Sequence, residues 1–187
     1  IYQGSYGDLV GNFTGNYSST AGGAIYNEGQ MIIANNHFDN NSSVNAGGAI
    51  YNVAKDRLFV SIEDEFNGNY SLNGGAVYNA SKYYSFSDIY TGNYSTAKVD
   101  SKTNVVTGGN GGAASNDKAG PWISNGDNFI NNEANNGGAV YNESTTSKIT
   151  NATFTGNKAN GVYNAKTGDL MSGGNGGAIY VTGGNKN

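Results

Sequence analysis

The sequence predicts an all-β protein, a parallel β-solenoid with about six three-stranded coils of roughly 25 residues each. The first observation is a Gly-Gly-Ala triplet that occurs six times, and the second is an aromatic-x-x-Asn box that precedes each triplet. The third is their spacing, because successive boxes begin 25, 28, 24, 39 and 25 residues apart. A period near 25 that keeps turn residues and β-formers in phase is typical of a solenoid in which one repeat forms one coil. The triplets begin at Gly22, Gly47, Gly74, Gly111, Gly137 and Gly176, and the boxes at Phe13, Phe38, Phe66, Tyr90, Phe129 and Phe154.

The three strands of one coil can be followed between the second and third boxes. The box Phe38–Asn41 is followed by Gly47–Asn52, and the apolar run Leu58–Ile62 then leads to the next box. Asn, Ser and Gly separate these β-prone segments, which is the pattern of short strands joined by turns. No segment has the apolar period of an amphipathic helix. We therefore expect strands only.

Alternation along the strands predicts which side chains face the core. The aliphatic residue after each triplet should point inward, and the box aromatics should form a second inward stack. The aliphatic residues are Ile25, Ile50, Val77, Val140 and Ile179, and the box aromatics include Phe13, Phe38, Phe66, Phe129 and Phe154. The tyrosine that follows each aliphatic residue should then face outward, which gives the row Tyr26, Tyr51, Tyr78, Tyr141 and Tyr180. This tyrosine row is a candidate surface for carbohydrate or for a second rod, although β-propensity and ring stacking also explain it without a ligand.

Asparagines recur at two corners of the predicted coil. One set follows the tyrosine row and the other closes each box, so in both sets like amides would face one another from coil to coil. Primary amides stacked in this way can hydrogen-bond as a ladder. The first set is Asn27, Asn52, Asn79, Asn116 and Asn142, and the second is Asn16, Asn41, Asn69, Asn93, Asn132 and Asn157. The Gly-Gly pair of each triplet indicates a tight corner that requires positive φ or a close approach of backbones.

The paired motifs resemble those of a known group of surface proteins. Gly-Gly-Ala-Ile together with Phe-x-x-Asn is similar to the motifs of chlamydial polymorphic outer membrane proteins. The longer phrase from Phe129 to Asn142 resembles archaeal adhesin-like proteins and bacterial autotransporter passengers. The resemblance covers essentially the whole chain. Among autotransporters, it is to the passenger segment alone. It implies a right-handed parallel β-helix, export to the cell surface, and an adhesive or matrix role.

Two coils are longer than the others, and we interpret the extra residues as hairpin insertions near 94–110 and 158–175. Both insertions end in the sequence Gly-Gly-Asn-Gly-Gly-Ala and contain two β-prone runs around a turn. They are expected at the same corner of the coil, two coils apart. Insertions in solenoids lie on one face and often bind a partner. A surface insertion without a partner is also consistent with the sequence, since long insertions cost little free energy.

The composition excludes several classes of partner. The 187 residues are interpreted as a single domain, 1–187, because the repeat extends through the whole chain. Only 13% of the residues are charged and the net charge is −4, so there is no basic stripe for nucleic acid or for an anionic membrane surface. The apolar runs are too short for membrane insertion by this segment. The absence of cysteine says nothing about compartment, since a solenoid buries its core without disulfides.

Candidate metal-binding and catalytic residues are few. The run from Glu63 to Glu65, with Asp56, could coordinate calcium through carboxylates, but its spacing fits no calcium loop. We interpret it as a solvated acidic run. His37 is the only histidine and is expected in a turn, and Trp122 after Pro121 is expected to be a local packing plug. We therefore predict no catalytic residue, no metal site and no cofactor.

Two functions are considered. The favoured one is an extracellular structural or adhesive protein of the cell surface, with host or matrix glycans as candidate ligands. The alternative is a carbohydrate-active β-helix enzyme, a polysaccharide lyase or hydrolase. Such enzymes gather carboxylates or a base in a cleft. Here the acidic residues are scattered, no two recur in stacked register, and Arg57 is the only arginine, so we predict that the protein is not an enzyme.

The two ends of the chain indicate a further partner. Ile1 and Tyr2 open the chain in the phase of a Gly-Gly-Ala-Ile-Tyr strand, and the chain stops shortly after Gly177–Val181 in the same phase. The ends of a solenoid need capping to cover open strand edges, and neither end has a polar cap in its sequence. We therefore expect head-to-tail contact with another copy, which gives an open filament, or contact with the rest of a longer chain.

Overall fold

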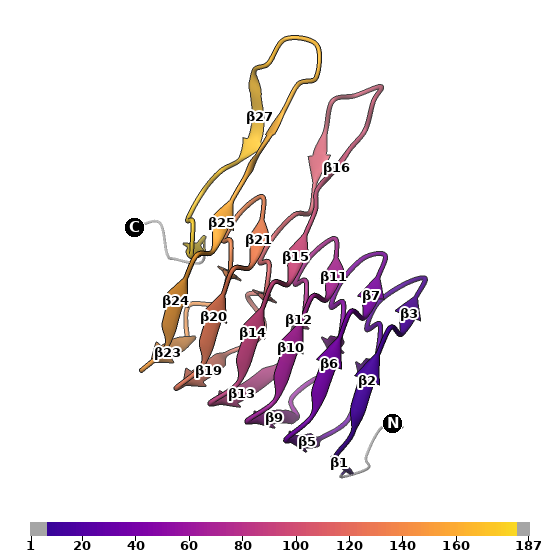
Figure 1. Ribbon diagram of the computed structural model, residues 1–187, viewed down its shortest axis with the longest axis vertical. Coiled ribbons are helices and arrows are strands. Elements are labelled where there is room, and N and C mark those ends of the chain that lie inside the picture. Colours follow the sequence, from indigo (N-terminus) through magenta and orange to yellow (C-terminus); the bar gives the residue numbers. More distant parts are fainter. Residues whose placement is uncertain (1–6, 183–187) are drawn as a thin grey trace.

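A computed structural model describes residues 7–182, and within this range the chain forms a β-solenoid of about six coils, shown in Figure 1. No helix occurs between residues 7 and 182. Most strands belong to four six-stranded sheets in which each strand pairs in parallel with the strands of the neighbouring coils. The predicted all-β parallel solenoid is therefore confirmed. The first residues, Ile1 and Tyr2, lie outside the described range.

Four short strands form each coil, one in each sheet. The first sheet contains β1 (Gly7–Leu9), β5 (Met31–Ala34), β9 (Leu58–Ile62), β13 (Lys82–Phe86), β19 (Trp122–Asn125) and β23 (Lys148–Thr150). The second contains β2 (Asn12–Thr14), β6 (His37–Asp39), β10 (Glu65–Asn67), β14 (Ile89–Thr91), β20 (Asn128–Ile130) and β24 (Thr153–Thr155). The third contains β3 (Tyr17–Ser18), β7 (Ser42–Ser43), β11 (Tyr70–Ser71), β15 (Tyr94–Ser95), β21 (Glu133–Ala134) and β25 (Lys158–Ala159). The fourth contains β4 (Ile25–Asn27), β8 (Ile50–Asn52), β12 (Val77–Asn79), β18 (Ala114–Asn116), β22 (Val140–Asn142) and β28 (Ile179–Val181).

Three strands per coil were predicted, but each coil has four. The strands of the third sheet were not predicted. Its strands are two residues long and include Ser-Ser in β7 and Glu-Ala in β21. Such sequences have no β-propensity. They adopt an extended conformation because the flanking sheets place them beside the equivalent positions of the next coil. Tyr70, for example, pairs with Tyr94.

The box aromatics form one continuous column through the core. Neighbouring rings from Phe13 to Phe154 stack with their centroids 4.8–4.9 Å apart and their planes 5–7° from parallel. Phe38, Phe66, Tyr90 and Phe129 are fully buried. The column has this spacing because the box strands pair residue for residue, Phe66 opposite both Phe38 and Tyr90.

Two further columns complete the apolar core. The aliphatic residues after the triplets stack in register, and Ile50, Val77 and Val140 are fully buried. In the first sheet Phe59 stacks on Tyr83 with ring centroids 4.9 Å apart, and Tyr83 stacks on Trp122 at 5.7 Å. Trp122 is buried, and its indole Nε1–H donates to Ser85 Oγ at 2.8 Å. This residue is thus a rung of a regular column rather than an isolated plug.

Both sets of asparagines form hydrogen-bonded ladders. In the set after the tyrosine row, each Nδ2 donates to the Oδ1 of the next coil over 2.6–2.8 Å, from Asn27 through to Asn142. In the box set, each Oδ1 accepts both the backbone N–H and the Nδ2–H of the preceding asparagine at 2.8–3.0 Å. The second Nδ2 hydrogen goes to a box carbonyl, as from Asn41 to Phe13. Buried amides satisfied in this way cost the fold little.

The Gly-Gly corner has two separate steric requirements. The first glycine of each triplet has φ between +60 and +64°. The second passes close to the next coil, and a Cβ built on Gly48 would lie 2.0 Å from the carbonyl oxygen of Gly75. In the first five triplets neither position accepts an L side chain without moving the backbone, and in the last triplet the positive φ of Gly176 sets the same requirement for the first glycine alone.

Introducing a charge into the aliphatic column tests this core. Ile50 is fully buried between Ile25 and Val77, so Ile50→Asp should destabilise the protein by more than about 4 kcal/mol through an unpaired buried charge. The matched variant Ile50→Val should cost only about 0.5–1.5 kcal/mol. Urea unfolding followed by far-UV circular dichroism measures both. Equal midpoints for the two variants would contradict the core assignment.

Candidate functional site

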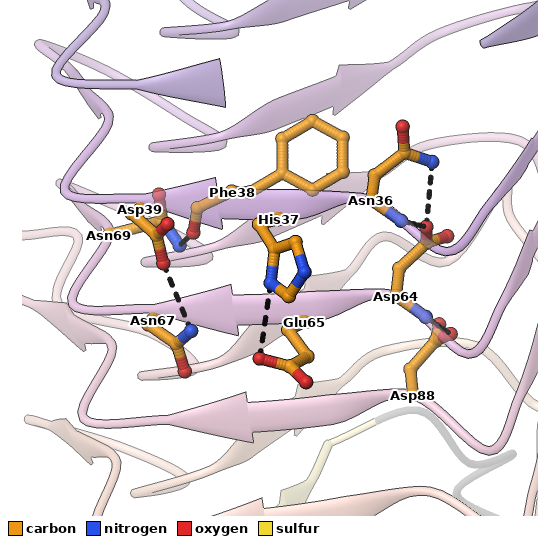
Figure 2. A network of polar contacts seen from close by, with 9 residues as sticks. All are labelled: Asn36, His37, Phe38, Asp39, Asp64, Glu65, Asn67, Asn69 and Asp88. Atoms are coloured by element: carbon orange, nitrogen blue, oxygen red, sulfur yellow. Dashed lines mark hydrogen bonds and ion pairs between the residues drawn. The ribbon is translucent and has the colours of Figure 1, made fainter. Parts of the chain in front are cut away.

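A column of one asparagine and three aspartates runs along the corner between the first and second sheets. Asn36, Asp64, Asp88 and Asp127 occupy equivalent positions in four successive coils and are all buried. The backbone N–H of each residue donates to the Oδ1 of the next, at 2.8 Å for Asn36, 3.0 Å for Asp64 and 2.9 Å for Asp88. Figure 2 shows the first three members, with Asn36 Nδ2 also donating to Asp64 Oδ1 at 2.8 Å. We call these four residues the aspartate column.

Burial raises the pKa of every aspartate in the column. Desolvation raises the pKa of Asp64 to about 6, against partial compensation from its hydrogen bonds with Asn36. Desolvation also raises the pKa of Asp127, and it raises that of Asp88 well above the ordinary value, with the neighbouring Asp127 adding to the effect. Other titratable groups that face the column are Tyr83, Tyr90 and His37. A column with so little positive charge around it favours protonated carboxyl groups.

Hydroxyl groups complete the hydrogen bonding of the column. Asp88 Oδ2 accepts from Ser61 Oγ and, at 3.3 Å, from the hydroxyl of Tyr90. Asp127 Oδ2 accepts from Ser124 Oγ at 2.6 Å and from Ser85 Oγ at 2.5 Å. These serines come from inward positions of the first sheet, so the network joins two sheets inside the solenoid.

The aspartate column overturns two expectations from the sequence. Acidic residues do recur in stacked register, since three aspartates follow one another in the column. The run from Glu63 to Glu65 is not uniformly solvated either, because Asp64 is buried while Glu63 is exposed. The spacings of 24 and 39 residues, one of them lengthened by an insertion, hid the register in the sequence. Across residues 7–182 no three His, Cys, Asp or Glu side chains are grouped as a metal site.

His37 does not lie in a turn, as the sequence suggested, but begins strand β6. Its Nδ1 is 3.2 Å from Glu65 Oε2 on the next coil, and both side chains are about half exposed (Figure 2). An ion pair so exposed contributes little to stability.

The tyrosine row lies on the outer side of the fourth sheet. Tyr26, Tyr51 and Tyr78 occupy consecutive rungs, with ring centroids 5.1 and 5.3 Å apart, and Tyr141 lies 5.7 Å from Tyr180. Tyr26 is 46% exposed and the other four are half-buried. The row is therefore in contact with solvent, and its role in binding stays a prediction.

Two antiparallel hairpins project from the solenoid at the third sheet, as Figure 1 shows. The first pairs β16 (Lys98–Val99) with β17 (Val106–Thr107), and the second pairs β26 (Gly161–Tyr163) with β27 (Leu170–Gly173). They lie within the long intervals 94–110 and 158–175 and leave the solenoid after β15 and β25. These two strands are separated in the third sheet by β21 alone.

Asn135, just after β21, connects the two hairpins. Its backbone N–H donates to Gly109 O at 2.8 Å, and its Oδ1 accepts from Ala97 N at 2.8 Å, both in the first insertion. Its Nδ2 donates to Asn160 O at 2.9 Å, and its carbonyl accepts from Gly174 N at 2.7 Å, both in the second insertion. Four polar groups of one residue therefore hold both hairpins at their bases.

The space between the hairpins is a groove lined by both polar and apolar residues. A cavity of about 250 Å³ at the base is lined by residues that include Tyr94, Thr96, Glu133, Asn135 and Asn160. A second cavity of about 430 Å³ lies between the hairpins themselves, lined from both sides by residues that include Val99, Asn104, Tyr163 and Met171. Val99, Val105, Tyr163 and Leu170 are 43–61% exposed. Exposed apolar side chains on paired projections are typical of an interaction surface.

The fold defines a β-solenoid repeat protein, and its tyrosine row and two hairpins are the candidate binding surfaces. One family model matches the chain. The Chlamydia polymorphic membrane protein repeat is similar to residues 11–28, 37–53 and 151–182, which together make up roughly a third of the chain. The matched residues lie in the first two coils and in the last coil. Comparison with curated proteins and with solved structures gives no significant match. Residues 7–182 contain no helix of the length and apolarity needed to cross a bilayer.

The aspartate column predicts that stability depends on pH. A carboxyl group whose pKa is raised to about 6 on folding contributes stability at low pH, and this contribution is lost as the pH rises through 6. Asp64→Asn should therefore raise the melting temperature at pH 7.5 and change it much less at pH 4.5. Asp56→Asn, at an exposed site, is the control and should have no such pH-dependent effect. An Asp64→Asn variant that is destabilised equally at both pH values would contradict the assignment.

A second prediction concerns Asn135. Asn135→Ala removes the acceptor of Ala97 N and the donor to Asn160 O, so the bases of both hairpins should open more readily. Amide hydrogen exchange at Ala97 should accelerate at least ten-fold. Asn45→Ala is the matched control, because Asn45 precedes the equivalent bridge residue Ala46 in a coil without an insertion. Unchanged exchange at Ala97 in Asn135→Ala would show that the hairpins are held by other contacts.

Proposed function

We propose that this chain acts at the cell surface, outside the cell, as a structural or adhesive β-solenoid. The observation that carries the proposal is a pair of projecting hairpins with exposed apolar side chains on a rigid solenoid. The three matches to the Chlamydia polymorphic membrane protein repeat support a location at the outer membrane or cell surface. The net charge of −4 and the scarcity of arginine support a partner other than nucleic acid.

The groove between the hairpins is the best candidate for the adhesive contact. Asn135 joins both insertions, so the two hairpins are positioned before a partner arrives. A binding surface that is ordered in advance loses less conformational entropy on binding. Tyr94 and Tyr163 beside polar amide groups could stack on the sugar rings of host or matrix glycans.

The alternative function, a polysaccharide lyase or hydrolase, has weaker support. Such enzymes place their carboxyl groups in an open cleft. Asp64, Asp88 and Asp127 are stacked, but each is buried and bonded to backbone or hydroxyl groups inside the solenoid. A polysaccharide chain therefore cannot contact them in the folded protein, and we propose a role that does not involve catalysis.

We also propose contacts along the rod axis, either head to tail with a second copy or with further residues of a longer chain. Among the described strands, β4 and β28 are the outermost members of the fourth sheet, and each pairs on one side only. An unpaired strand edge can accept another strand. Sedimentation velocity over a range of concentrations separates the two cases, because a head-to-tail contact does not close and species size would grow with concentration.

Surface location is tested with antibodies raised against the purified chain. We expect them to label intact cells of the source organism without permeabilisation, whereas a cytosolic marker protein stays unlabelled. Labelling that requires permeabilisation would contradict a surface location.

Adhesion is tested with shortened insertions. Replacing residues 96–109 by one leucine, as in the β11 coil, and residues 160–174 by one asparagine, as in the β21 coil, should leave the solenoid folded. Beads coated with this variant should attach to glycan- or matrix-coated surfaces at least ten-fold less than beads with the unaltered chain. Variants with a single shortened insertion are the controls for each hairpin. Full attachment after both replacements would rule out the groove.

A further inference from the structure

The tyrosine row is interrupted at one rung. Along the fourth sheet, Tyr78 is paired with Ser115, and Ser115 with Tyr141, so a serine takes the position that tyrosine has on either side. Elsewhere in the row, neighbouring ring centroids are 5.1–5.7 Å apart; Tyr51 and Tyr78 are stacked, and the other two pairs are tilted. At Ser115 one ring of the stack is missing.

The missing ring leaves a cavity. It has a volume of about 110 Å³ and is lined by Tyr78 and Tyr141, with Ser115 between them. Since strands are about 4.8 Å apart, the two tyrosines are separated by about twice that spacing. A flat group placed between them would therefore take the position of the missing rung of the row. We call this cavity the Ser115 slot.

The polar lining of the Ser115 slot is rich in acceptors. Asp117 and Glu143, on adjacent coils, both line the slot. Tyr78 donates its hydroxyl hydrogen to Asp117 Oδ2 at 3.1 Å, and Tyr141 donates to Glu143 Oε1 at 2.8 Å, so both hydroxyls are already used. The one ion pair within residues 7–182 joins His37 to Glu65, which leaves both slot carboxylates without a basic partner in that range.

An unpaired acceptor supports the same conclusion. Asn73 also lines the slot, and its Oδ1 is buried with no hydrogen-bond partner among the described residues. A buried acceptor without a donor is costly and uncommon in folded proteins. A ligand with several hydrogen-bond donors would satisfy it together with the free oxygens of the two carboxylates.

We propose that the Ser115 slot binds the guanidinium group of an arginine side chain presented by a partner protein. A guanidinium is flat and positively charged and carries only donors, and it stacks on aromatic faces. It therefore fits a slot with two tyrosine walls, two carboxylates and an amide oxygen. A neutral sugar ring would also stack between the tyrosines, but it would leave both negative charges uncompensated. The proposal rests on the proposed function, in that this face must be open to partners outside the cell.

The experiment titrates N-acetyl-arginine amide into the ¹⁵N-labelled chain and follows the amide signals of Ser115, Asp117 and Tyr141 by NMR. We expect saturable shifts with a dissociation constant on the order of 1 mM for this minimal probe. Ser115→Tyr restores the missing ring, so it should weaken binding at least ten-fold while the melting temperature stays equal or rises. Ser115→Ala leaves the slot open and should bind as the unaltered chain does.

A second variant keeps the test independent of folding. Glu143→Gln changes a partly exposed side chain and should weaken binding several-fold without affecting stability. Equal binding by Ser115→Tyr, no shifts up to about 20 mM probe, or shifts with maltose but not with the arginine probe would each overturn the proposal. Because surface labelling of cells is measured separately, a failed titration leaves the proposed location standing. Labelling that requires permeabilisation would contradict a surface location. The slot would then have no access to a partner protein outside the cell, whatever the titration shows.

Discussion

Each coil of this protein rests on the next at the spacing of paired strands, so most interior side chains have their own counterpart as nearest neighbour. Box rings meet at 4.8–4.9 Å and lie nearly parallel, while asparagines of one coil donate to those of the next over 2.6–3.0 Å. Rings can repeat in this way because their flat faces pack against like faces, and primary amides can because each has a donor for one neighbour and an acceptor for the other. The requirement that a side chain pack against its own kind therefore decides which residue types occupy the interior.

The aspartate column shows what happens where this requirement is hard to meet. A carboxylate has acceptors only, and a column of carboxylates repels itself. Here Asn36 donates to Asp64, backbone N–H groups bond the column from coil to coil, and serine and tyrosine hydroxyls supply further donors. Burial disfavours the charged form of all three carboxyl groups, which raises the pKa values of Asp64, Asp88 and Asp127, and for Asp88 repulsion from Asp127 adds to this effect. Within residues 7–182, the buried acidic side chains all lie at this corner, so this is where the core is coupled to pH.

Sequence periodicity was sufficient to predict the solenoid and the stacking of like residues, because each box and triplet keeps its phase within a coil. It was insufficient where the signal was not periodic. The two-residue strands such as Ser42–Ser43 have no propensity of their own, and the insertion between Asp88 and Asp127 concealed their shared column. In the sequence, Asn135 could not be told from other turn asparagines. Its four hydrogen bonds reach residues at the bases of two insertions, and only the folded chain brings these residues to it.

The same stacking explains why the candidate binding features lie at departures from the repeat. A regular coil hydrogen-bonds to its neighbours and offers a partner little that is unsatisfied. The hairpins interrupt the regular coil between a strand of the third sheet and the Gly-Gly corner that follows it. Asn135, on the coil between them, holds the two hairpins as a pair. The Ser115 slot departs from the regular coil by replacing one tyrosine with serine, which leaves a cavity lined by two tyrosines, two carboxylates and Asn73, whose Oδ1 has no hydrogen-bond partner among the described residues. In a protein whose interior admits few substitutions, such interruptions are where binding specificity can arise without loss of the fold.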